Sequence, residues 1–89
     1  MEKCYINDEC YEMKEGIDFS QDTDKWLEFL AELEDENDIM RSLIELTKEK
    51  YINVKMDDQE VSCEEYERVM TERIACNASC INFISEKLV

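Results

Sequence analysis

The sequence predicts an α+β fold: a small antiparallel sheet made from two short hairpins, packed against two or three helices. Two long segments carry apolar residues at helical spacing, and two short segments resemble strands on either side of polar turns. The chain also has one Gly and no Pro among its 89 residues, so most of it should be regular, with tight connections. Because a chain of this length leaves no room for a second core, residues 1–89 are expected to form a single domain.

The first hairpin is predicted near the start of the chain. Residues 3–6 and 10–13 are two short strand-like runs around the polar turn Asn7-Asp8-Glu9. Gly16 then provides the one position at which a positive φ carries no steric cost. Residues 17–19 are expected to be extended and to pack on the helix that follows.

Residues 23–50 carry the strongest helical pattern of apolar positions. The preceding segment, 20–24, supplies residues that cap helix N-termini and acids that suit the dipole of the first turn. Asn37 falls on the otherwise apolar stripe, in a region that is polar on all sides. Because Asn favours caps over helix interiors, we expect two helices here, over 23–35 and 37–50.

The second hairpin and the last helix follow directly. Residues 51–56 alternate between apolar and polar side chains and predict a strand. Residues 57–58 predict a turn, and residues 59–61 a short return strand. Ser62 is followed three residues later by a Glu, the capping-box pattern that opens a helix. We expect that helix to run to about residue 87.

The net charge of −14 is concentrated in the first half of the chain. Residues 1–40 carry 14 acidic and 3 basic side chains, a net charge of −11, whereas residues 41–89 carry 10 and 7, a net charge of −3. Such a field repels nucleic acid and anionic membranes, and it attracts basic protein surfaces. The simpler interpretation is that the acidic excess only keeps a small protein in solution.

The densest charge lies in the segment 22–38, which holds eight carboxylates and one Lys. As a helix this segment spans about 25 Å. Its charge then amounts to roughly one per 3.6 Å, close to the one per 3.4 Å along a single strand of duplex DNA. Like charges at i and i+4 destabilise a helix, and a face that is merely solvated usually mixes in bases, as the last helix does. This contrast between the two helical segments favours a functional role for the acids.

The candidate partner-binding residues are the carboxylates on the outward side of this helical segment, with a second group at the second hairpin. They are Asp24, Glu28, Glu32, Glu34, Asp35, Glu36 and Asp38 on the segment, and Asp57, Asp58 and Glu60 at the hairpin. Successive members of the main helical row are separated by about 6 Å of rise. Together the two groups could present staggered rows of charge, as a duplex does.

Five Cys residues are present: Cys4, Cys10, Cys63, Cys76 and Cys80. Two pairs of thiolates, at 4 and 10 and at 76 and 80, could hold a structural zinc. Zinc pairs are usually closer in sequence and lie on turns, so we expect free thiols that pack as small hydrophobic side chains, with no metal and no cofactor. A catalytic thiolate is disfavoured because there is no His to activate it and a negative field raises a thiol pKa.

Four residues alternate as the first ligands of a calcium-binding EF-hand loop do: Asp18, Ser20, Asp22 and Asp24. The pattern then fails, because Thr23 stands where the loop needs Gly and Phe29 stands where it needs a bidentate Glu. A helix cap with acids on its first turn accounts for the same residues.

No phosphate-binding loop, nucleotide motif or Ser-His-Asp set occurs in the sequence. Carboxylates are so numerous that no acid–base pair stands out. We therefore expect a binding protein and not an enzyme. The chain begins with acids where an export signal needs an apolar core, so a cytosolic location is expected, in the host cell if a phage encodes the protein, with the thiols reduced.

In size, acidity and lack of catalytic groups, the chain resembles the DNA-mimic proteins that phages and mobile elements use against host nucleases, such as anti-CRISPR, antirestriction and uracil-glycosylase inhibitor proteins. The resemblance lies in composition and not in a motif, so it assigns no residues. It implies an inhibitor whose carboxylates occupy the basic channel of a nucleic-acid-processing enzyme. The expected partner is thus a protein with a basic surface, with no direct contact to nucleic acid or membrane.

The alternative is a structural or adaptor module with no nucleic-acid-related target. Its exposed apolar edge would bind a partner helix or a second copy of the chain, giving a homodimer, and the acids would serve solubility. Salt separates the two hypotheses. Mimicry predicts an affinity that falls steeply as salt rises, whereas an apolar contact predicts little change.

Overall fold

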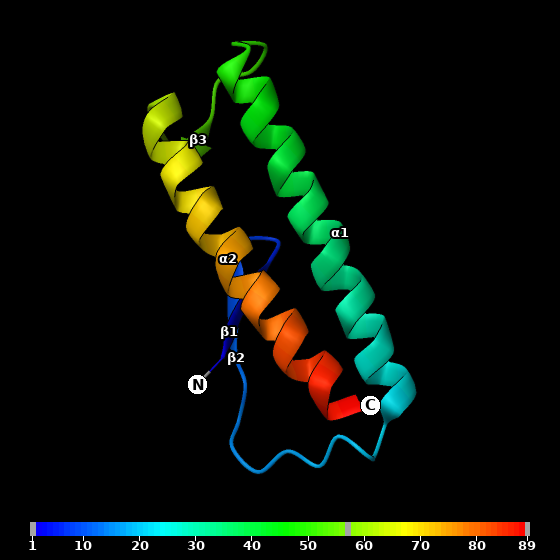
Figure 1. Cartoon of the computed structure of the whole chain (residues 1–89). Helices are drawn as coiled ribbons and strands as arrows, with labels where there is room; N and C mark the ends of the chain where they lie inside the picture. Colours follow the sequence, from blue (N-terminus) through cyan, green and yellow to red (C-terminus); the bar gives the residue numbers. More distant parts are fainter. Residues whose placement is uncertain (1, 57, 89) are drawn as a thin grey trace.

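The computed structural model describes residues 2–56 and 58–88 and shows two long helices that run antiparallel, each preceded by a β-hairpin (Figure 1). The molecule is elongated, with extents of 45 × 19 × 17 Å. Its elements in order are β1 (Lys3–Ile6), β2 (Glu9–Glu12), α1 (Thr23–Lys48), β3 (Lys55–Met56), β4 (Gln59–Glu60) and α2 (Cys63–Leu88). The predicted α+β class is confirmed, although the strands form two separate two-stranded sheets and not one.

The first hairpin forms where it was predicted. β1 and β2 are antiparallel, and the pairing of Ile6 with Glu9 leaves a two-residue turn at Asn7 and Asp8. These two residues have φ angles of 51° and 68°, the left-handed pair that matches the twist of a tight hairpin and that Asn and Asp tolerate. β2 therefore begins at Glu9, one residue earlier than predicted, because the turn needs only two residues.

The prediction of two helices over 23–35 and 37–50 is wrong, because α1 is one continuous helix of 26 residues. Asn37 does not cap an end. It is 3% exposed, and its Nδ2 donates a hydrogen bond of 3.4 Å to the Ile74 carbonyl oxygen on α2. Packing against α2 thus overrides the local preference of Asn for helix ends.

The ends of α1 also differ from the simple capping pattern. Asp22 is the N-cap residue with a left-handed φ of 56° and no side-chain capping bond. At the other end the Tyr51 N–H donates to the Leu46 carbonyl and the Lys50 N–H to the Thr47 carbonyl, both at 3.0 Å. These two bonds form a Schellman motif, with Lys50 in the left-handed position that Gly usually fills.

The second hairpin is shorter than predicted. Only Lys55–Met56 of the expected strand 51–56 pairs with Gln59–Glu60. The start of the expected strand is used differently, because the Tyr51 N–H takes part in the motif that ends α1. One further bond, from the Val61 N–H to the Val54 carbonyl at 3.1 Å, extends the contact between the two arms. Asp57, placed in the predicted turn, lies outside the described residues.

α2 matches its prediction closely. It begins at Cys63, directly after Ser62, whose Oγ accepts a hydrogen bond of 3.2 Å from the Glu65 N–H. This bond is the N-cap half of the predicted capping box. The helix ends at Leu88, one residue beyond the predicted end. Within the described residues, neither helix has a stretch that is long and apolar enough to cross a membrane.

The buried side chains form two clusters along the contact between α1 and α2. The lower cluster in Figure 1 joins both helices to β1 and to the segment before α1, where the ring of Phe19 lies 4.7 Å from Trp26 and 5.9 Å from Phe83. The upper cluster is formed by Met40, Ile44, Tyr66 and Met70. Phe19 is buried, as expected for residues 17–19.

Asn77 ties β1 to α2. Its side chain is fully buried, its Oδ1 accepts a hydrogen bond of 2.6 Å from the Tyr5 N–H, and its Nδ2 donates one of 2.9 Å to the Tyr5 carbonyl. The amide of Asn77 thereby satisfies the hydrogen-bonding groups of the Tyr5 backbone, both N–H and C=O, although the two residues are 72 positions apart in sequence. By contrast, the Oδ1 of Asn37 is buried without a hydrogen-bond partner.

These two Asn residues should therefore respond differently to substitution. We expect Asn77→Ala to lower the free energy of unfolding by about 2–3 kcal/mol, because the Tyr5 N–H and C=O lose their partners in a buried site. Asn37→Leu should change it by less than about 1 kcal/mol, because it removes an unsatisfied oxygen and replaces it with an apolar group of similar shape. Urea unfolding monitored by circular dichroism measures both. Equal losses for the two variants would contradict this assignment.

Candidate protein-binding surface

The row of carboxylates predicted on the first helical segment lies on the outward side of α1. Four of them are exposed and share an arc of about 80° on the helix, and we call them the acidic stripe: Asp24, Glu28, Glu32 and Asp35. The buried positions of the helix lie on the side away from them: Leu33, Asn37, Met40, Ile44 and Thr47. The contact with α2 and the acidic stripe therefore occupy opposite sides of one helix.

No member of the acidic stripe takes part in an ion pair among the described residues. The acids of α2 are different. Glu65 and Glu72 both approach Arg68, at 3.8 and 3.5 Å, and Glu67 lies 2.9 Å from Lys48 of α1. The stripe thus leaves its charge available, whereas much of the acid on α2 is balanced within the chain.

The other three acids predicted as binding residues on this segment differ in their exposure and in their contacts. Glu34 is exposed, outside the arc of the stripe. Glu36 is half-buried, and its Oε1 accepts a hydrogen bond of 3.3 Å from the Asn7 N–H in the turn of the first hairpin. Asp38 is exposed and paired with Arg41 at 3.1 Å. Glu36 and Asp38 therefore also have structural contacts within the chain.

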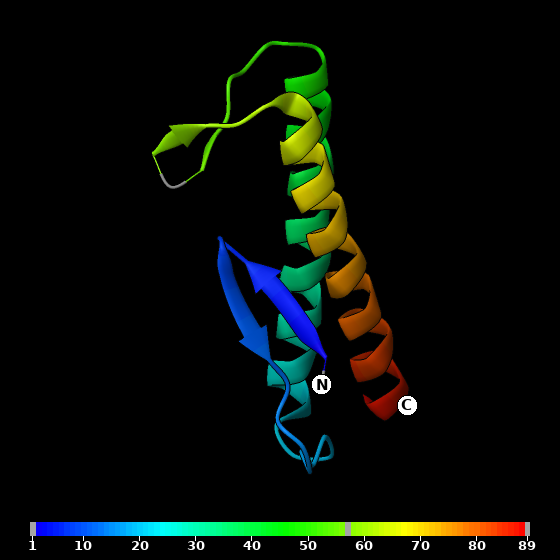
Figure 2. The ribbon, with the colours of Figure 1, turned by 90° about the vertical axis from the view of Figure 1, so that its left-hand side faces the viewer.

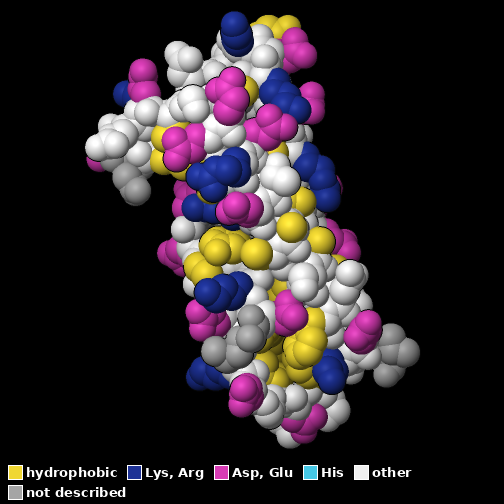
Figure 3. Space-filling view, turned by 60° about the vertical axis from the view of Figure 1, so that its left-hand side comes forward, with side chains coloured by type: hydrophobic (Ala, Val, Ile, Leu, Met, Phe, Trp, Pro, Cys, Tyr) yellow, Lys and Arg dark blue, Asp and Glu magenta, His cyan; other side chains and the backbone are white. Residues whose placement is uncertain are grey.

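The second predicted acidic group belongs to a different element. Asp58 and Glu60 are exposed on the β3–β4 hairpin, which projects from the helix pair (Figure 2). On the face from which this hairpin projects, acidic and basic side chains are mixed, with small apolar patches between them (Figure 3). This mixture contrasts with the acidic stripe, which contains no base.

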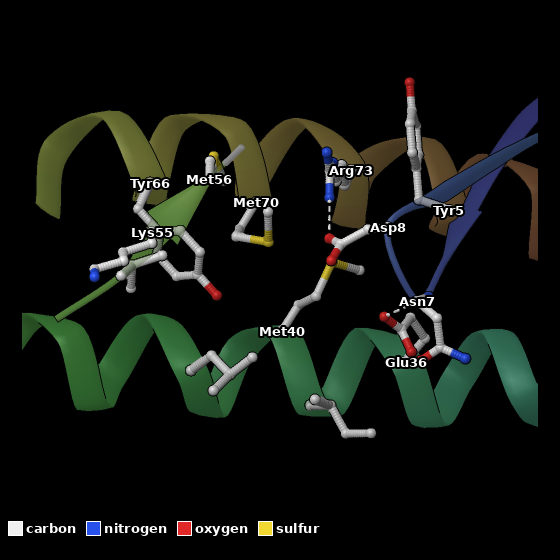
Figure 4. Close-up of a pocket in the computed structure, with 13 residues that line it drawn as sticks. Tyr5, Asn7, Asp8, Glu36, Met40, Lys55, Met56, Tyr66, Met70 and Arg73 are labelled. Carbon is white, nitrogen blue, oxygen red and sulfur yellow. Dashed lines mark hydrogen bonds and ion pairs between the residues drawn. The ribbon is translucent and has the colours of Figure 1, made fainter. Parts of the chain in front are cut away.

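A groove that the sequence pattern does not predict lies between the two hairpins, and we call it the interhairpin groove (Figure 4). It has a volume of about 480 Å³ and draws its lining from α1, α2, the β1–β2 turn and β3. Met40 and Met70 point into it from the two helices, and the Arg73 Nη1 lies 2.9 Å from the Asp8 Oδ1 at the end near the first hairpin. Three of the five Met residues line this groove. They come from segments far apart in the chain, so their positions in the sequence do not predict that they lie together.

The Cys residues are distributed differently from a four-thiolate site. Cys4 and Cys80 are fully buried together in the lower cluster, whereas Cys10 is exposed on β2. Burial raises the pKa of Cys4 and raises the pKa of Cys80 to about 12, and the neighbouring Cys4 thiol adds to the effect at Cys80. In residues 2–56 and 58–88 no three His, Cys, Asp or Glu side chains are grouped so that they could hold a metal ion.

The loop before α1 uses its acid to shape the backbone. Asp18 accepts hydrogen bonds from the Ser20 N–H at 3.0 Å and from the Ser20 hydroxyl at 2.5 Å, which lowers the pKa of its carboxyl. This side-chain-to-backbone turn accounts for the first residues of the apparent calcium-loop pattern.

Comparison with protein-family profiles, curated proteins and solved structures finds no match for the chain. The acidic stripe and the interhairpin groove are therefore the two surfaces of the molecule that suggest a function.

The buried thiols predict an alkaline loss of stability. Below about pH 9 the Cys80 thiol is neutral in both the folded and the unfolded chain. As pH rises above its ordinary pKa of 9.0, the unfolded thiol ionises while the folded one, with a pKa of about 12, does not. The free energy of unfolding should therefore fall between pH 9 and pH 12.

The control for this effect is the double substitution Cys4→Ala with Cys80→Ala, which also removes the raised pKa of Cys4. Urea unfolding under reducing conditions at about pH 8 and pH 10.5 should show a smaller loss for this variant than for the original chain. The difference isolates the thiols from Tyr66, whose pKa burial also raises. An identical loss in the two proteins would contradict the prediction.

Proposed function

We propose that this protein imitates the charge of nucleic acid and binds a Lys- and Arg-lined surface of a nucleic-acid-processing enzyme, thereby excluding the substrate. The observation that supports the proposal best is the acidic stripe: four exposed carboxylates on one side of α1, none of them in an ion pair among the described residues. The protein would act by binding and not by catalysis, as anti-CRISPR and antirestriction inhibitors do.

The stripe has an energetic cost that solubility does not explain. Like charges at i and i+4 destabilise a helix by about 0.2–0.5 kcal/mol per pair, and Asp24, Glu28 and Glu32 form two such pairs in succession. On α2, by contrast, Glu65 and Glu72 are not at this spacing, and Arg68 between them pairs with both. A basic partner would provide such pairing to α1 from outside the chain.

The spacing of the charges also suits a nucleic-acid site. The i to i+4 steps of the stripe each advance about 6 Å along the axis, and the wider segment 22–38 approaches the linear charge density of a DNA strand. The field of the whole molecule, with a net charge of −14, would draw a cationic channel toward it and accelerate association. Because the ionic atmosphere screens exposed charges over about 8 Å at physiological salt, the affinity should fall as salt rises.

A second candidate function is an adaptor module that associates through apolar contacts. It is favoured by exposed apolar residues on α1, of which Leu27 is 52%, Ile39 53% and Leu46 40% exposed. Association of this kind, including formation of a homodimer, would change little with salt.

Capture of the partner tests the proposed function. The tagged protein is incubated with a nuclease-treated lysate at low and high salt, and a triple variant, Glu28→Lys, Glu32→Lys and Asp35→Lys, is compared with it. We expect capture of a nucleic-acid-processing enzyme at low salt, loss of capture at high salt, and an affinity at least about tenfold weaker for the variant, because three attractive charges become repulsive.

The matched control makes the same change of net charge on α2, away from the acidic stripe. Glu64→Lys, Glu72→Lys and Glu86→Lys replace three exposed acids on α2, so net charge changes by the same amount while the stripe is intact. This control should retain more affinity than the stripe variant. Equal affinities for the two variants would show that only net charge matters, and capture that is insensitive to salt would favour the adaptor.

A further inference from the structure

We infer that the interhairpin groove is a docking site for a short, basic, amphipathic helix of a partner protein. The inference does not depend on nucleic-acid mimicry, because no residue of the acidic stripe lines the groove. It depends on the lining and dimensions of the groove and on the net charge of the whole molecule.

The lining of the groove combines adaptable apolar side chains with five polar or charged ones. Its apolar part consists of seven side chains from both helices and the second hairpin: Ile39, Met40, Leu43, Val54, Met56, Tyr66 and Met70. Met40, Tyr66 and Met70 form its floor and belong to the buried upper cluster. Ile39, at its edge, is 53% exposed in a chain whose surface is otherwise rich in charge. Met side chains are unbranched and can repack around different apolar groups. A surface of this kind is suited to receiving apolar side chains from another molecule.

The dimensions fit a segment of about two helical turns. Tyr66, Met70 and Arg73 lie at i, i+4 and i+7 on α2, so the floor of the groove extends about 10 Å along that helix. The β1–β2 turn stands at one end, and β3 stands at the other (Figure 2). Two or three apolar side chains at i, i+3 or i+4, and i+7 of a docked helix would fill this length.

Charge selects the occupant. Two copies of this chain would repel each other, because each has a net charge of −14. Nucleic acid and anionic membranes are also negatively charged and would be repelled in the same way. A basic segment would be attracted by the whole molecule. Within the groove, the acids Asp8 and Glu36 are balanced by the bases Lys55 and Arg73, so the attraction comes from the net charge of the whole molecule and not from the lining. Although Asp8 pairs with Arg73, its side chain is 90% exposed, so its second oxygen can accept from a Lys or Arg of the partner.

The probe for this site is a synthetic 14-residue peptide of Leu and Lys, with Leu at helical spacing. Two control peptides separate its properties: one replaces each Leu with Ser, and the other replaces each Lys with Glu. Fluorescence anisotropy measures the affinity for the whole protein. We expect the Leu/Lys peptide to bind at least about tenfold more tightly than either control, because both apolar burial and opposite charge are needed.

The methyl resonances of Met locate the peptide without any substitution in the protein. Met40, Met56 and Met70 line the groove, whereas Met13 lies in the lower cluster and does not line it. Added Leu/Lys peptide should shift the first three resonances and leave that of Met13 unchanged. Shifts confined to backbone amides of the acidic stripe, with the three groove methyls unmoved, would overturn the inference.

Substitutions provide the second measurement. Ile39→Ser with Met56→Ser should weaken peptide binding at least about tenfold through loss of apolar burial. Leu27→Ser with Leu46→Ser is the matched control, because both Leu side chains are exposed on α1 and neither lines the groove. Unchanged affinity of the groove variant, equal binding of the Leu/Glu peptide, or self-association that shifts the groove methyls without peptide would each overturn the proposed occupant.

Discussion

The contact between α1 and α2 is the constraint on which the rest of the structure depends. Two antiparallel helices of 26 residues each bury one stripe against the other, and that contact decides the direction of every other side chain on them. Leu33 and Met40 face α2, so Glu28 and Glu32 must face away from it. The outward position of the acidic stripe is thus a consequence of core packing, and it holds as long as the helix pair stays together.

The hairpins add features that the helix pair alone would not have. The buried amide of Asn77 fixes the backbone of β1 beside α2, and the second hairpin packs Val54 and Met56 against the upper cluster. Between them the two helices remain uncovered by any described strand, which leaves the interhairpin groove (Figure 2). The acidic stripe and the groove therefore come from one architecture, the first from the helix contact and the second from the separation of the hairpins.

Local signals in the sequence predicted local structure well. The predicted polar turn Asn7-Asp8-Glu9 does connect two strands, although only Asn7 and Asp8 form it, and Ser62 is used as the predicted N-cap. Asn37 misled the prediction because its partner, the Ile74 carbonyl, is 37 residues away, and no local pattern reveals such a bond. The groove was missed for the same reason, since its lining combines four segments that only the fold brings together. The exposure of the acidic stripe followed from periodicity alone.

The most direct test of the central claim is carboxylate footprinting of the protein with its captured partner. Water-soluble carbodiimide and an amine label exposed carboxylates, and mass spectrometry compares the labelling in the free and bound states. The account predicts that Asp24, Glu28, Glu32 and Asp35 are protected in the complex, while Glu86 on α2 stays reactive. Protection of the α2 carboxylate with full labelling of the acidic stripe would contradict it.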